Sequence, residues 1–454
     1  MRLFEWRWLV VSSVLLGALA QAETRPQYGG TLHVAMRAAP VSLDPADNTQ
    51  SDSFARRSVT MLMFDTLVTT DENGRVQPSL TASWQLASNN HGWQFRLRRG
   101  IKFHDGTSLT AEIAAASLRA ANPSWNVSTD GDSVTIEGSD PELPAQLALP
   151  RNAIAKRSDS GKPSGTGPFH IADWQPGKKL VLAADEGCWR GRPFLDGIEI
   201  EMGRSFRDQM TALELGKADL VEVAPEQSHR AALDGRRLAN SRPIELVALV
   251  FGRDVKSADD KMLREALALS VERGSIRSVL LQGAGQPAGS ILPNWMSGYG
   301  FVFPMDADLP RARHAREQVR SIPTWTIAYD ANDPIARLLT ERIALNARDA
   351  GLLLQPTTAP AADLRLVRIP LASADPWIAL ADVAALAGLP VTKNKSGSVE
   401  ELYAGEQSLL ATQRLIPLFH LPASYAASAS LKNWTARSDG SWSVADAWLG
   451  SGKP

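Results

Sequence analysis

The stretch WQFRLRRGIKFHDGTSLTAE, residues 93–112, joins a strand pattern, a turn and a helix start in one continuous segment. Its first apolar residues alternate with polar ones, which is the period-two pattern of a half-buried strand. Because a polar run ending in glycine precedes this strand, residues 84–103 are predicted to form a hairpin. After the following turn, the sequence predicts a helix that reaches about residue 120 and has Thr110 as its N-cap.

Strand and helix patterns alternate along the rest of the chain. Alternating apolar residues predict strands, and apolar residues three or four positions apart predict amphipathic helices. The predicted strands lie within 28–36, 133–137, 169–174, 219–221 and 352–355, and the predicted helices are 56–69, 206–216, 259–281 and 336–350. This alternation indicates an α/β architecture with mixed sheets.

The composition is that of an ordinary globular protein. The chain has 454 residues, with 48 Lys and Arg against 49 Asp and Glu, so its formal net charge is -1. This balance argues against a nucleic acid or an anionic membrane as a partner held through bulk charge. A single hydrophobic core stops growing near ~250–300 residues, so the chain is predicted to divide into at least two lobes. The one cysteine, Cys188, excludes an internal disulfide and a cysteine-rich metal site.

Residues 1–22 have the pattern of a secretory signal peptide. Two arginines precede the uncharged run LVVSSVLLGALA at 9–20, and the small residues at 20 and 22 favour cleavage after Ala22. The alternative is an uncleaved membrane anchor, but the run is shorter than the ~20 apolar residues that span a bilayer. We therefore expect export to a bacterial periplasm, where an unpaired thiol is best tolerated when it is buried.

The sequence lacks the residue patterns of a catalytic or metal site. Its seven histidines do not stand at metal-ligand spacing, and neither a G-x-S-x-G nor a C-x-x-C motif occurs. The glycine-rich segment 283–289 contains Pro287 and leads into no helix, so it is interpreted as a loop and not as a dinucleotide site. Cys188 has Arg190 as its only basic neighbour and is expected to be a buried, inert thiol. We expect no enzyme activity, no cofactor and no metal.

A series of short motifs extends the segment 93–112 over nearly the whole chain. In order they are YGGTLHVAM (28–36), SLDPA (42–46), FDTLVTTDENGRVQPSLTASW (64–84), GTGPF (165–169), ALELGKADL (212–220), LREALALSVERGSI (263–276), GAGQPAG with LP (283–293), ADPW (374–377) and IPLF (416–419). This series resembles the extracellular solute-binding proteins of family 5, the oligopeptide- and dipeptide-binding components of bacterial ABC importers. Within that resemblance, the segment 93–112 matches the most recognisable stretch of the family.

The resemblance implies a two-lobed periplasmic binding protein fold, type II and cluster C-like, with a hinge of two crossing strands. Lobe I is expected at 23–245 with a shortened subdomain at about 55–160, lobe II at 246–412, and a C-terminal return to lobe I at 413–454. Hinge closure would trap a ligand between the lobes.

The chain departs from the family by being short. The intervals 118–165 and 375–416 are compressed, which affects the outer walls of the cleft. After the GTGP strand, Cys188 takes the place of a packing aromatic residue. These departures change the surroundings of the cleft and leave the order of the motifs intact.

The resemblance also places the ligand. Peptide-carrying members hold an extended peptide through main-chain bonds to two segments, a form of β-augmentation. By motif position these segments are Thr49, Gln50 and Ser51, and Arg368, Ile369 and Pro370. Pro370 has no N–H and can only accept a hydrogen bond.

One family position is altered in a way that bears on the ligand. An aspartate that pairs with the ligand's α-ammonium is replaced by Ala372, which removes a charge-assisted hydrogen bond worth ~1.5–3 kcal/mol. Either Asp375 or another acid replaces that aspartate, or the ligand is not an ordinary peptide.

Three further side chains are candidates for the cleft. Trp295 and Trp377 are either cleft aromatics or ordinary core packing. Arg368 either pairs with a ligand carboxylate or is a solvated surface residue.

The sequence thus predicts a monomeric binding protein that delivers an oligopeptide or dipeptide-like solute to the permease subunits of an ABC importer. The alternative ligands are a nickel chelate, haem, an oligosaccharide or a blocked peptide, because one scaffold of this kind accepts several solute classes. A secreted enzyme and a non-transport sensor or chaperone are further alternatives.

Overall fold

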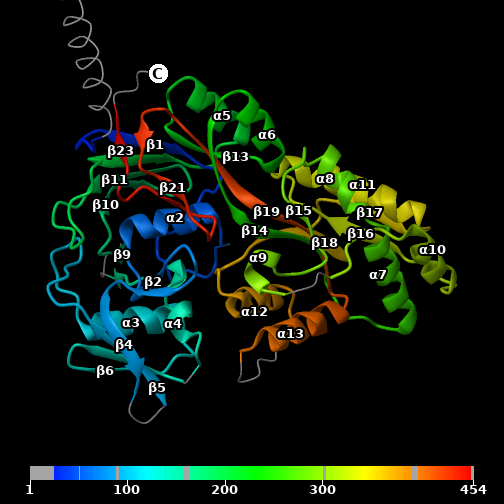
Figure 1. Ribbon diagram of the computed structural model, residues 1–454, viewed down its shortest axis with the longest axis horizontal. Helices are drawn as coiled ribbons and strands as arrows, with labels where there is room; N and C mark the ends of the chain where they lie inside the picture. Colours follow the sequence, from blue (N-terminus) through cyan, green and yellow to red (C-terminus); the bar gives the residue numbers. More distant parts are fainter. Residues whose placement is uncertain are drawn as a thin grey trace, which may run out of the picture.

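The computed structural model describes residues 25–50, 52–87, 91–138, 140–157, 163–299, 303–389 and 397–450. Figure 1 shows two lobes side by side, joined by long strands. One lobe holds the first part of the chain, the other holds most of the second part, and the last strands return to the first lobe. The predicted signal peptide and Ser51 lie outside the described residues.

One large sheet extends through both lobes. In the part of the chain that the structure describes, it has 11 strands and combines parallel and antiparallel pairs. Its order is β10 (Phe169–Gln175), β11 (Lys179–Ala184), β12 (Gly197–Glu201), β1 (Thr31–Ala35), β13 (Leu220–Val223), β19 (Leu415–Ala427), β14 (Arg237–Phe251), β18 (Leu364–Pro370), β16 (Thr324–Ala328) and β17 (Leu353–Thr357), with β15 (Gln286–Pro287) paired to β19. The mixed α/β architecture predicted from the sequence is confirmed.

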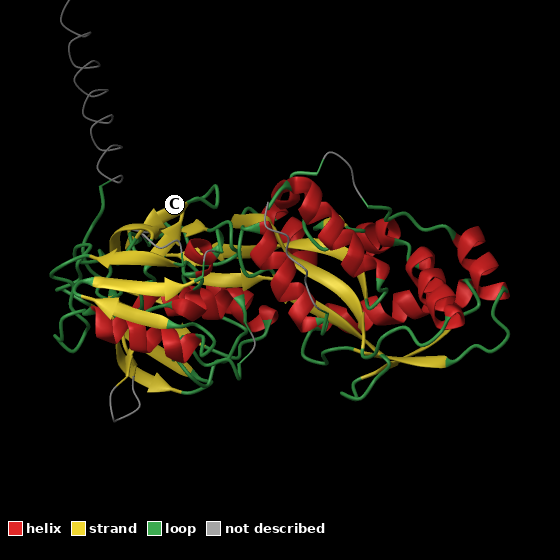
Figure 2. Ribbon diagram, turned by 90° about the horizontal axis from the view of Figure 1, so that it is seen from below, coloured by secondary structure: helices red, strands yellow, loops and turns green. Residues whose placement is uncertain are grey.

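The strands β14 and β19 cross between the lobes. They pair antiparallel from Arg237↔Ala427 to Val250↔Leu415, with register shifts along the way. Near one end β19 also pairs with β13, and near the other end β14 pairs with β18. Because each crossing strand belongs to the hydrogen-bonded network of both lobes, this pair is the connection about which the lobes can move. In Figure 2 these strands run lengthwise between helices that cover the sheet.

Helices cover both lobes. In the first lobe they are α2 (Phe54–Met63), α3 (Ala111–Ala121), α4 (Leu143–Gln146), α5 (Phe206–Glu214) and α6 (Pro225–Leu233), with the 3-10 helix Pro150–Asn152. In the second they are α7 (Ala258–Ser270), α8 (Arg273–Val279), α9 (Asn294–Ser297), α10 (Leu309–Glu317), α11 (Pro334–Asp349), α12 (Pro376–Leu386) and α13 (Val399–Ala411).

Separate apolar clusters lie within each part of the molecule. One lies around β1, β12 and α2 in the first lobe, and another lies around α7, α11 and β16 in the second. A third lies under a four-stranded sheet, in the order β4 (Thr81–Leu86), β5 (Gly92–Leu97), β7 (Ser133–Glu137) and β6 (Val127–Asp130), which packs on α3. Short strand pairs complete the fold: β2 (Val68–Thr70) with β3 (Val76–Pro78), β8 (Lys156–Arg157) with β9 (Pro163–Ser164), β20 (Leu431–Lys432) with β23 (Trp448–Leu449), and β21 (Thr435–Ala436) with β22 (Trp442–Ser443).

The segment 93–112 folds as predicted. The strands β4 and β5 form the antiparallel hairpin. Thr110 is the N-cap of α3, and its hydroxyl accepts a hydrogen bond from the N–H of Ile113 at 3.4 Å. The buried position of Cys188 is also confirmed.

The helix predicted at 56–69 is shorter than expected. The helix α2 ends at Met63, Phe64 is extended, and Leu67 lies outside the helix. Asp65 instead forms a bridge with Ile154, and the next residues enter β2. The prediction was too long because Leu67 is buried in the extended segment, just as Val59 and Met63 are buried in the helix. The four-residue spacing of apolar residues therefore continues past the end of the helix.

The helix predicted at 259–281 is two helices. Val271, between α7 and α8, has the extended angles φ -76° and ψ 111°. The guanidinium of Arg273 donates to the carbonyl oxygens of Ala268 at 3.2 Å and Pro417 at 2.9 Å. This buried arginine thus binds the end of α7 and the crossing strand β19 together, which interrupts the helix.

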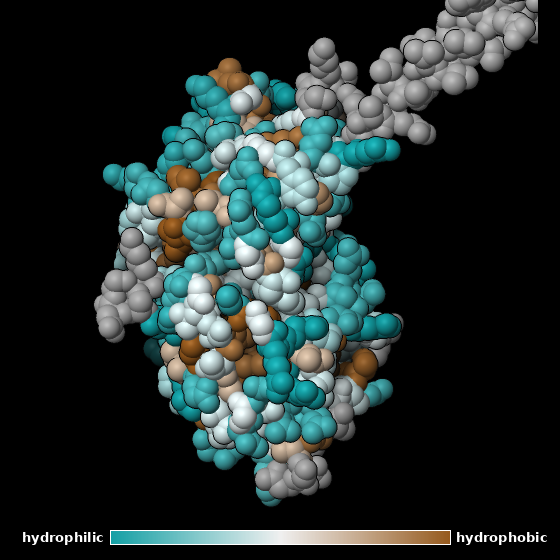
Figure 3. Space-filling model, turned by 90° about the vertical axis from the view of Figure 1, so that its left-hand side faces the viewer, coloured by the Kyte–Doolittle hydropathy of each residue, from teal (hydrophilic) through white to brown (hydrophobic). Residues whose placement is uncertain are grey.

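Among the described residues, no helix combines the length and the apolar character needed to cross a membrane. Figure 3 shows hydrophilic side chains spread over the face of the molecule on the left of Figure 1, with apolar residues in small separate groups.

Candidate ligand-binding site

A cavity of about 820 Å³ lies between the lobes. Residues of the first lobe line it on one side and residues of the second lobe line it on the other, with the crossing strands between them. Its charged lining residues are Arg37, Asp52, Arg204, Glu222, Glu245, Asp330, Asp333 and Arg368. Clefts of ~300–1,000 Å³ with a few convergent polar groups are the usual form of small-molecule sites.

The first lobe presents the ends of three neighbouring strands to the cavity. The parallel pair β1 and β13 is in register at Ala35↔Val221, and β13 continues to Val223, which pairs with Ser424 of β19. Arg37 follows β1 by two residues, so it lies at the same end of the sheet as Val223 and Ser424. The carboxyl ends of parallel strands are where open α/β sheets bind ligands.

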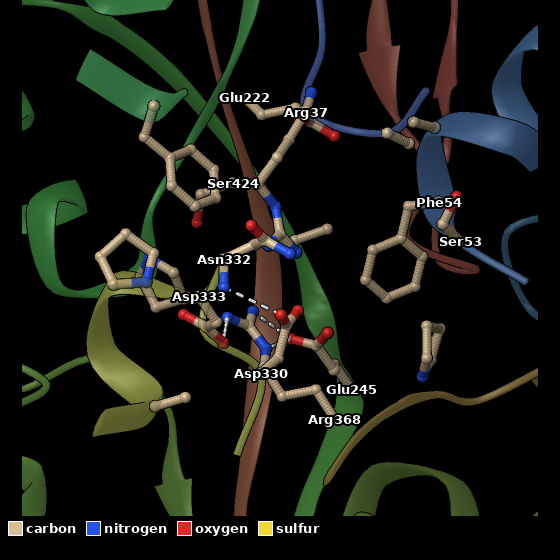
Figure 4. Close-up of a pocket in the computed structure, with 18 of the residues that line it drawn as sticks. Arg37, Ser53, Phe54, Glu222, Glu245, Asp330, Asn332, Asp333, Arg368 and Ser424 are labelled. Atoms are coloured by element: carbon tan, nitrogen blue, oxygen red, sulfur yellow. Dashed lines mark hydrogen bonds and ion pairs between the residues drawn. The ribbon is translucent and has the colours of Figure 1, made fainter. Parts of the chain in front are cut away.

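Arg368 of β18 lies in an ion-pair network at the bottom of the cavity. Its Nε and Nη2 donate to Oε2 of Glu245 at 3.1 and 2.5 Å, and its Nη1 donates to Oδ2 of Asp333 at 3.1 Å (Figure 4). Burial alone would lower the pKa of Arg368, but the two carboxylates outweigh it and raise the pKa. Arg368 therefore keeps its charge in the cavity, where it is outnumbered by its two acidic partners.

Glu222 of β13 lines the cavity on the side of the first lobe. Its Oε2 accepts hydrogen bonds from the backbone N–H of Arg37 at 2.5 Å and from Nε2 of Gln209 at 3.3 Å. Burial raises the pKa of this carboxyl, although these donors and the Arg37 charge oppose the rise. Glu222 therefore holds the backbone of Arg37 in place.

The segment predicted around Arg368 lies on the cavity. Arg368 and Pro370 line it, whereas Ile369 is 5% exposed and packs in an apolar cluster of the second lobe. The alternation follows from the strand period of β18, which directs neighbouring side chains to opposite faces.

The segment predicted around Thr49 lies just outside the cavity lining. The N–H and hydroxyl of Thr49 donate to Asp47, and the side chain of Gln50 bonds to the backbone of Ser42. The next residues along the chain, 52–55, do line the cavity.

The remaining predicted residues lie in helix caps and packing contacts. Asp375 is the N-cap of α12 and accepts from the N–H groups of Trp377 at 3.0 Å and Ile378 at 3.1 Å. Trp377 is 7% exposed and packs in the same apolar cluster as Ile369. Nε1 of Trp295 donates to the carbonyl oxygen of Pro243 at 2.7 Å. None of these three side chains lines the cavity between the lobes, as far as the structure describes the chain.

Arg57, which sequence reasoning did not single out, occupies the end of β18. It is 2% exposed, pairs with Asp52, and donates to the carbonyl oxygens of Leu371 at 2.8 Å, Asp439 at 3.0 Å and Pro370 at 3.2 Å. Beyond it, Ala372 lines a separate cavity of about 480 Å³. The guanidinium of Arg57 therefore lies close to Ala372, the position at which the resemblance implies an aspartate.

Sequence reasoning also missed Arg37, Glu222, Glu245, Asp330, Asp333 and Ser424. Arg37 and Asp330 each come two residues after a strand and Asp333 is the N-cap of a helix, whereas Glu222, Glu245 and Ser424 lie within strands. Such positions are common along the chain. The one available signal was that Arg37 comes directly after the strand predicted at 28–36, because ligand-binding side chains often lie just past strand ends. Within the described ranges, no group of three His, Cys, Asp or Glu side chains could hold a metal ion.

Comparisons with known proteins agree with this architecture. Solved structures similar to the model include NikA from Staphylococcus aureus in complex with Ni(L-His)2, with a TM-score of 0.75, 19% identity, and coverage of 90% of this chain and 97% of that one. AppA from Bacillus subtilis in complex with a nonapeptide has a TM-score of 0.77 and 17% identity, and the match covers 94% and 100% of the two chains. At these identities the similarity establishes the fold.

Sequence relatives carry names with several ligands. The nickel-binding protein NikA of Staphylococcus aureus is 28% identical over 243 residues, which is 50% of this chain and 49% of that protein. The oligopeptide-binding protein AppA of Bacillus subtilis is 23% identical over 330 residues, 66% and 59% of the two chains. The matches thus span about half to six-tenths of the length of these relatives.

The family model described as bacterial extracellular solute-binding proteins, family 5 Middle, matches residues 75–366. This range includes the hairpin segment, the strand β14, the helices between β14 and β18, and the first three residues of β18. The chain therefore belongs to family 5 of the bacterial extracellular solute-binding proteins.

Proposed function

We propose that the protein is the periplasmic solute-binding component of an ABC importer, which captures an oligopeptide or dipeptide-like ligand between its lobes and delivers it to membrane permease subunits. The observation that carries the proposal is the cavity between the lobes, which lies along an open edge of β18. A signal peptide cleaved after Ala22 and a monomeric state are part of the same proposal.

The open edge of β18 supports a peptide ligand. The strand β16 pairs with β18 in register up to Ala328↔Arg365, and the residues of β18 that follow line the cavity. On the opposite edge β18 pairs with β14, and just past the end of β18 the N–H of Leu371 donates to the carbonyl oxygen of Ile244 in β14 at 2.8 Å. Because an antiparallel strand alternates its hydrogen bonds between its two sides, Arg368 directs its N–H and C=O away from β14. An extended peptide could pair with these groups by β-augmentation.

The division of the chain into two lobes supports the proposal that the lobes close over a bound ligand. The proposed lobes are 23–245, with a subdomain at about 55–160, and 246–412, followed by a return at 413–454. One boundary falls within β14 and the other falls two residues before β19, so both stand at the crossing strands. A change in the angle between two lobes at such a hinge closes the cavity over a ligand.

A non-peptide solute is the alternative, because relatives of this chain include proteins named for nickel and haem. Purified protein should be incubated with dipeptides, oligopeptides, a nickel–histidine complex, haem and oligosaccharides, and its Tm and the fate of each ligand should be recorded. A rise in Tm with intact peptide supports the proposal. A rise with one of the other solutes transfers the proposal to that solute, and turnover of any ligand would replace it with an enzyme.

A further inference from the structure

Two hydrogen-bond donors on the first-lobe side of the cavity, Arg37 and Ser424, have no acceptor for their side chains among the described residues. The hydroxyl of Ser424 is 5% exposed as a residue and has no hydrogen-bond partner in the part of the chain that the structure describes. The guanidinium of Arg37 lies over the ring of Phe206 at 5.4 Å from its centroid, and it forms no hydrogen bond or ion pair with a described residue. A buried hydroxyl without a partner costs ~1–3 kcal/mol, so such a group marks a place where a ligand atom binds.

These two donors point to one region. The strands that carry them are separated by β13 alone, and both residues stand at the same end of the sheet. Figure 4 shows Arg37 reaching into the cavity from above, on the side where Ser424 lies. A guanidinium and a hydroxyl together provide the donors that a carboxylate accepts.

The second-lobe side of the cavity carries a surplus of negative charge, whereas on the first-lobe side Arg37 and Arg204 are balanced by Asp52 and Glu222. Arg368 is the cation there, and Glu245, Asp333 and Asp330 are the carboxylates, so three negative charges against one positive charge leave a surplus of two. Asp330 is exposed and has one oxygen bonded to the N–H of Asn332 at 2.9 Å. A positively charged group of a ligand would neutralise part of this surplus.

The C-terminal end of β18, at Pro370, is unfavourable for a positively charged group of a ligand. Arg57 already donates to the carbonyl oxygens of Pro370 and Leu371, and Ala372 offers no carboxylate. An ammonium group placed there would meet the like charge of Arg57, whose ion pair among the described residues is with Asp52. The acids on Arg368 are therefore the better location for a cation.

We propose, on the basis of the function proposed above, that the captured solute is a small zwitterion. Its carboxylate binds to the guanidinium of Arg37 and the hydroxyl of Ser424. Its cationic group lies against Asp330 and the Glu245–Asp333 pair. The solute thus bridges the two lobes with charges of opposite sign and stabilises the closed form.

The first test is a comparison of solute classes by the rise in Tm of the whole mature protein. The zwitterionic class consists of free amino acids and dipeptides, including alanyl-alanine, and it is compared with putrescine, succinate and maltose. We expect the rise with zwitterions alone. A rise with putrescine, succinate or maltose and none with zwitterions would overturn the inference while leaving a solute-binding function in place. No rise with any of these solutes would overturn the inference. No rise either with the oligopeptides, nickel–histidine complex, haem and oligosaccharides named above would overturn the proposed function as well.

The second test uses variants and capped ligands. Arg37→Gln is expected to weaken the best-binding dipeptide about 10- to 100-fold and to leave its C-terminal amide unchanged, because the amide lacks the charge that Arg37 recognises. Ser424→Ala should show the same pattern with a smaller loss. Asp330→Asn should weaken the free dipeptide and leave its N-acetyl derivative unchanged.

The matched control is Arg236→Gln, which removes an arginine that is paired with Glu214 at 2.9 Å and lies outside the cavity lining. Each variant is first checked for an unchanged urea midpoint in the absence of ligand. Arg37→Lys should recover part of the lost affinity, because it restores the positive charge. Equal losses for the free and the amidated dipeptide in Arg37→Gln would show that Arg37 only shapes the cavity and would overturn the proposal.

Discussion

The guanidinium of Arg57 and the carbonyl oxygen of Pro370 are joined by a hydrogen bond of 3.2 Å between α2 of the first lobe and the end of β18. This contact uses the last acceptor on the side of β18 that faces the cavity. It also links the first lobe directly to the strand that carries Arg368. The edge of β18 at which we propose that a peptide binds is therefore limited by a residue of the chain itself.

Arg57→Met is expected to lower the free energy of unfolding by ~1–3 kcal/mol, because it leaves the carbonyl oxygens of Leu371, Asp439 and Pro370 without their donor, while the half-exposed carboxylate of Asp52 can be solvated. Urea denaturation measures this loss. The control is Arg99→Met, whose partner Asp132 is reached at 2.7 Å on the surface and whose loss should cost ~0–1 kcal/mol. Equal effects of the two variants would contradict a buried network at Arg57.

Two buried ionisable groups on either side of Ile291 should give opposite pH dependences of stability. Glu406 accepts hydrogen bonds from the N–H of Ile291 and of Leu292 and from the hydroxyl of Tyr299, and burial raises its pKa to about 7. Nε2 of His420 bonds to the carbonyl oxygen of Ile291 at 3.0 Å, and burial lowers the pKa of His420 to about 4.

The sign follows from the protons bound in each state. Glu406 favours the folded state below its unfolded pKa near 4.5, and this contribution of ~3 kcal/mol is lost as the pH rises to about 7. His420 makes the opposite contribution, which is present above pH 6.5 and is lost as the pH falls to about 4. Between pH 4.5 and 6.5 the two slopes oppose each other.

Glu406→Gln should therefore become more stable as the pH rises from 4.5 to 6.5, while the parent protein changes little through these two groups. Urea midpoints at pH 4.5, 6.5 and 8 measure the difference. His420→Gln is the complementary variant, in which stability should fall over the same interval. Parallel pH profiles for all three proteins would show that neither group titrates in this way.

Gly165 lies against the backbone at the end of α2. A Cβ atom at this position would lie 1.9 Å from the carbonyl oxygen of Met63, so Gly165→Ala should cost ~1–3 kcal/mol through forced backbone movement. Gly274 in α8 is the control, because a Cβ there meets nothing within 4 Å and the residue is exposed. Gly274→Ala should stabilise the protein by up to ~1 kcal/mol through helix propensity. Thermal and urea denaturation of both variants give the comparison, and a neutral Gly165→Ala would mean that the two segments can separate.

Cys188 should not react with thiol reagents in the native protein. It is buried, and desolvation raises the pKa of its thiol although Arg190 opposes the rise. Because the thiolate is the reactive form, burial and a raised pKa both slow the reaction. Labelling with a chromogenic disulfide should require denaturant, and rapid labelling of the folded protein would show that the thiol is accessible.

The sequence by itself determined the local elements and the family. The hairpin and the N-cap of α3 follow from period-two alternation and from Thr110, because each depends on residues within a few positions of one another. The order of motifs identified the family for the same reason, since each motif forms a turn or an element end in its own neighbourhood. Helix ends were less certain: the predicted helix at 259–281 is broken because Arg273 binds a carbonyl oxygen of β19, which is distant along the chain.

Only the tertiary structure decided which side chains meet in the cavity. Arg37 and Ser424 lie at opposite ends of the sequence, and the pairing of β1, β13 and β19 brings them to one end of the sheet. Glu245 and Asp333 meet Arg368 from a crossing strand and from the start of α11. Such neighbours are set by strand order and register, which are properties of the assembled sheet, and no spacing along the chain encodes them.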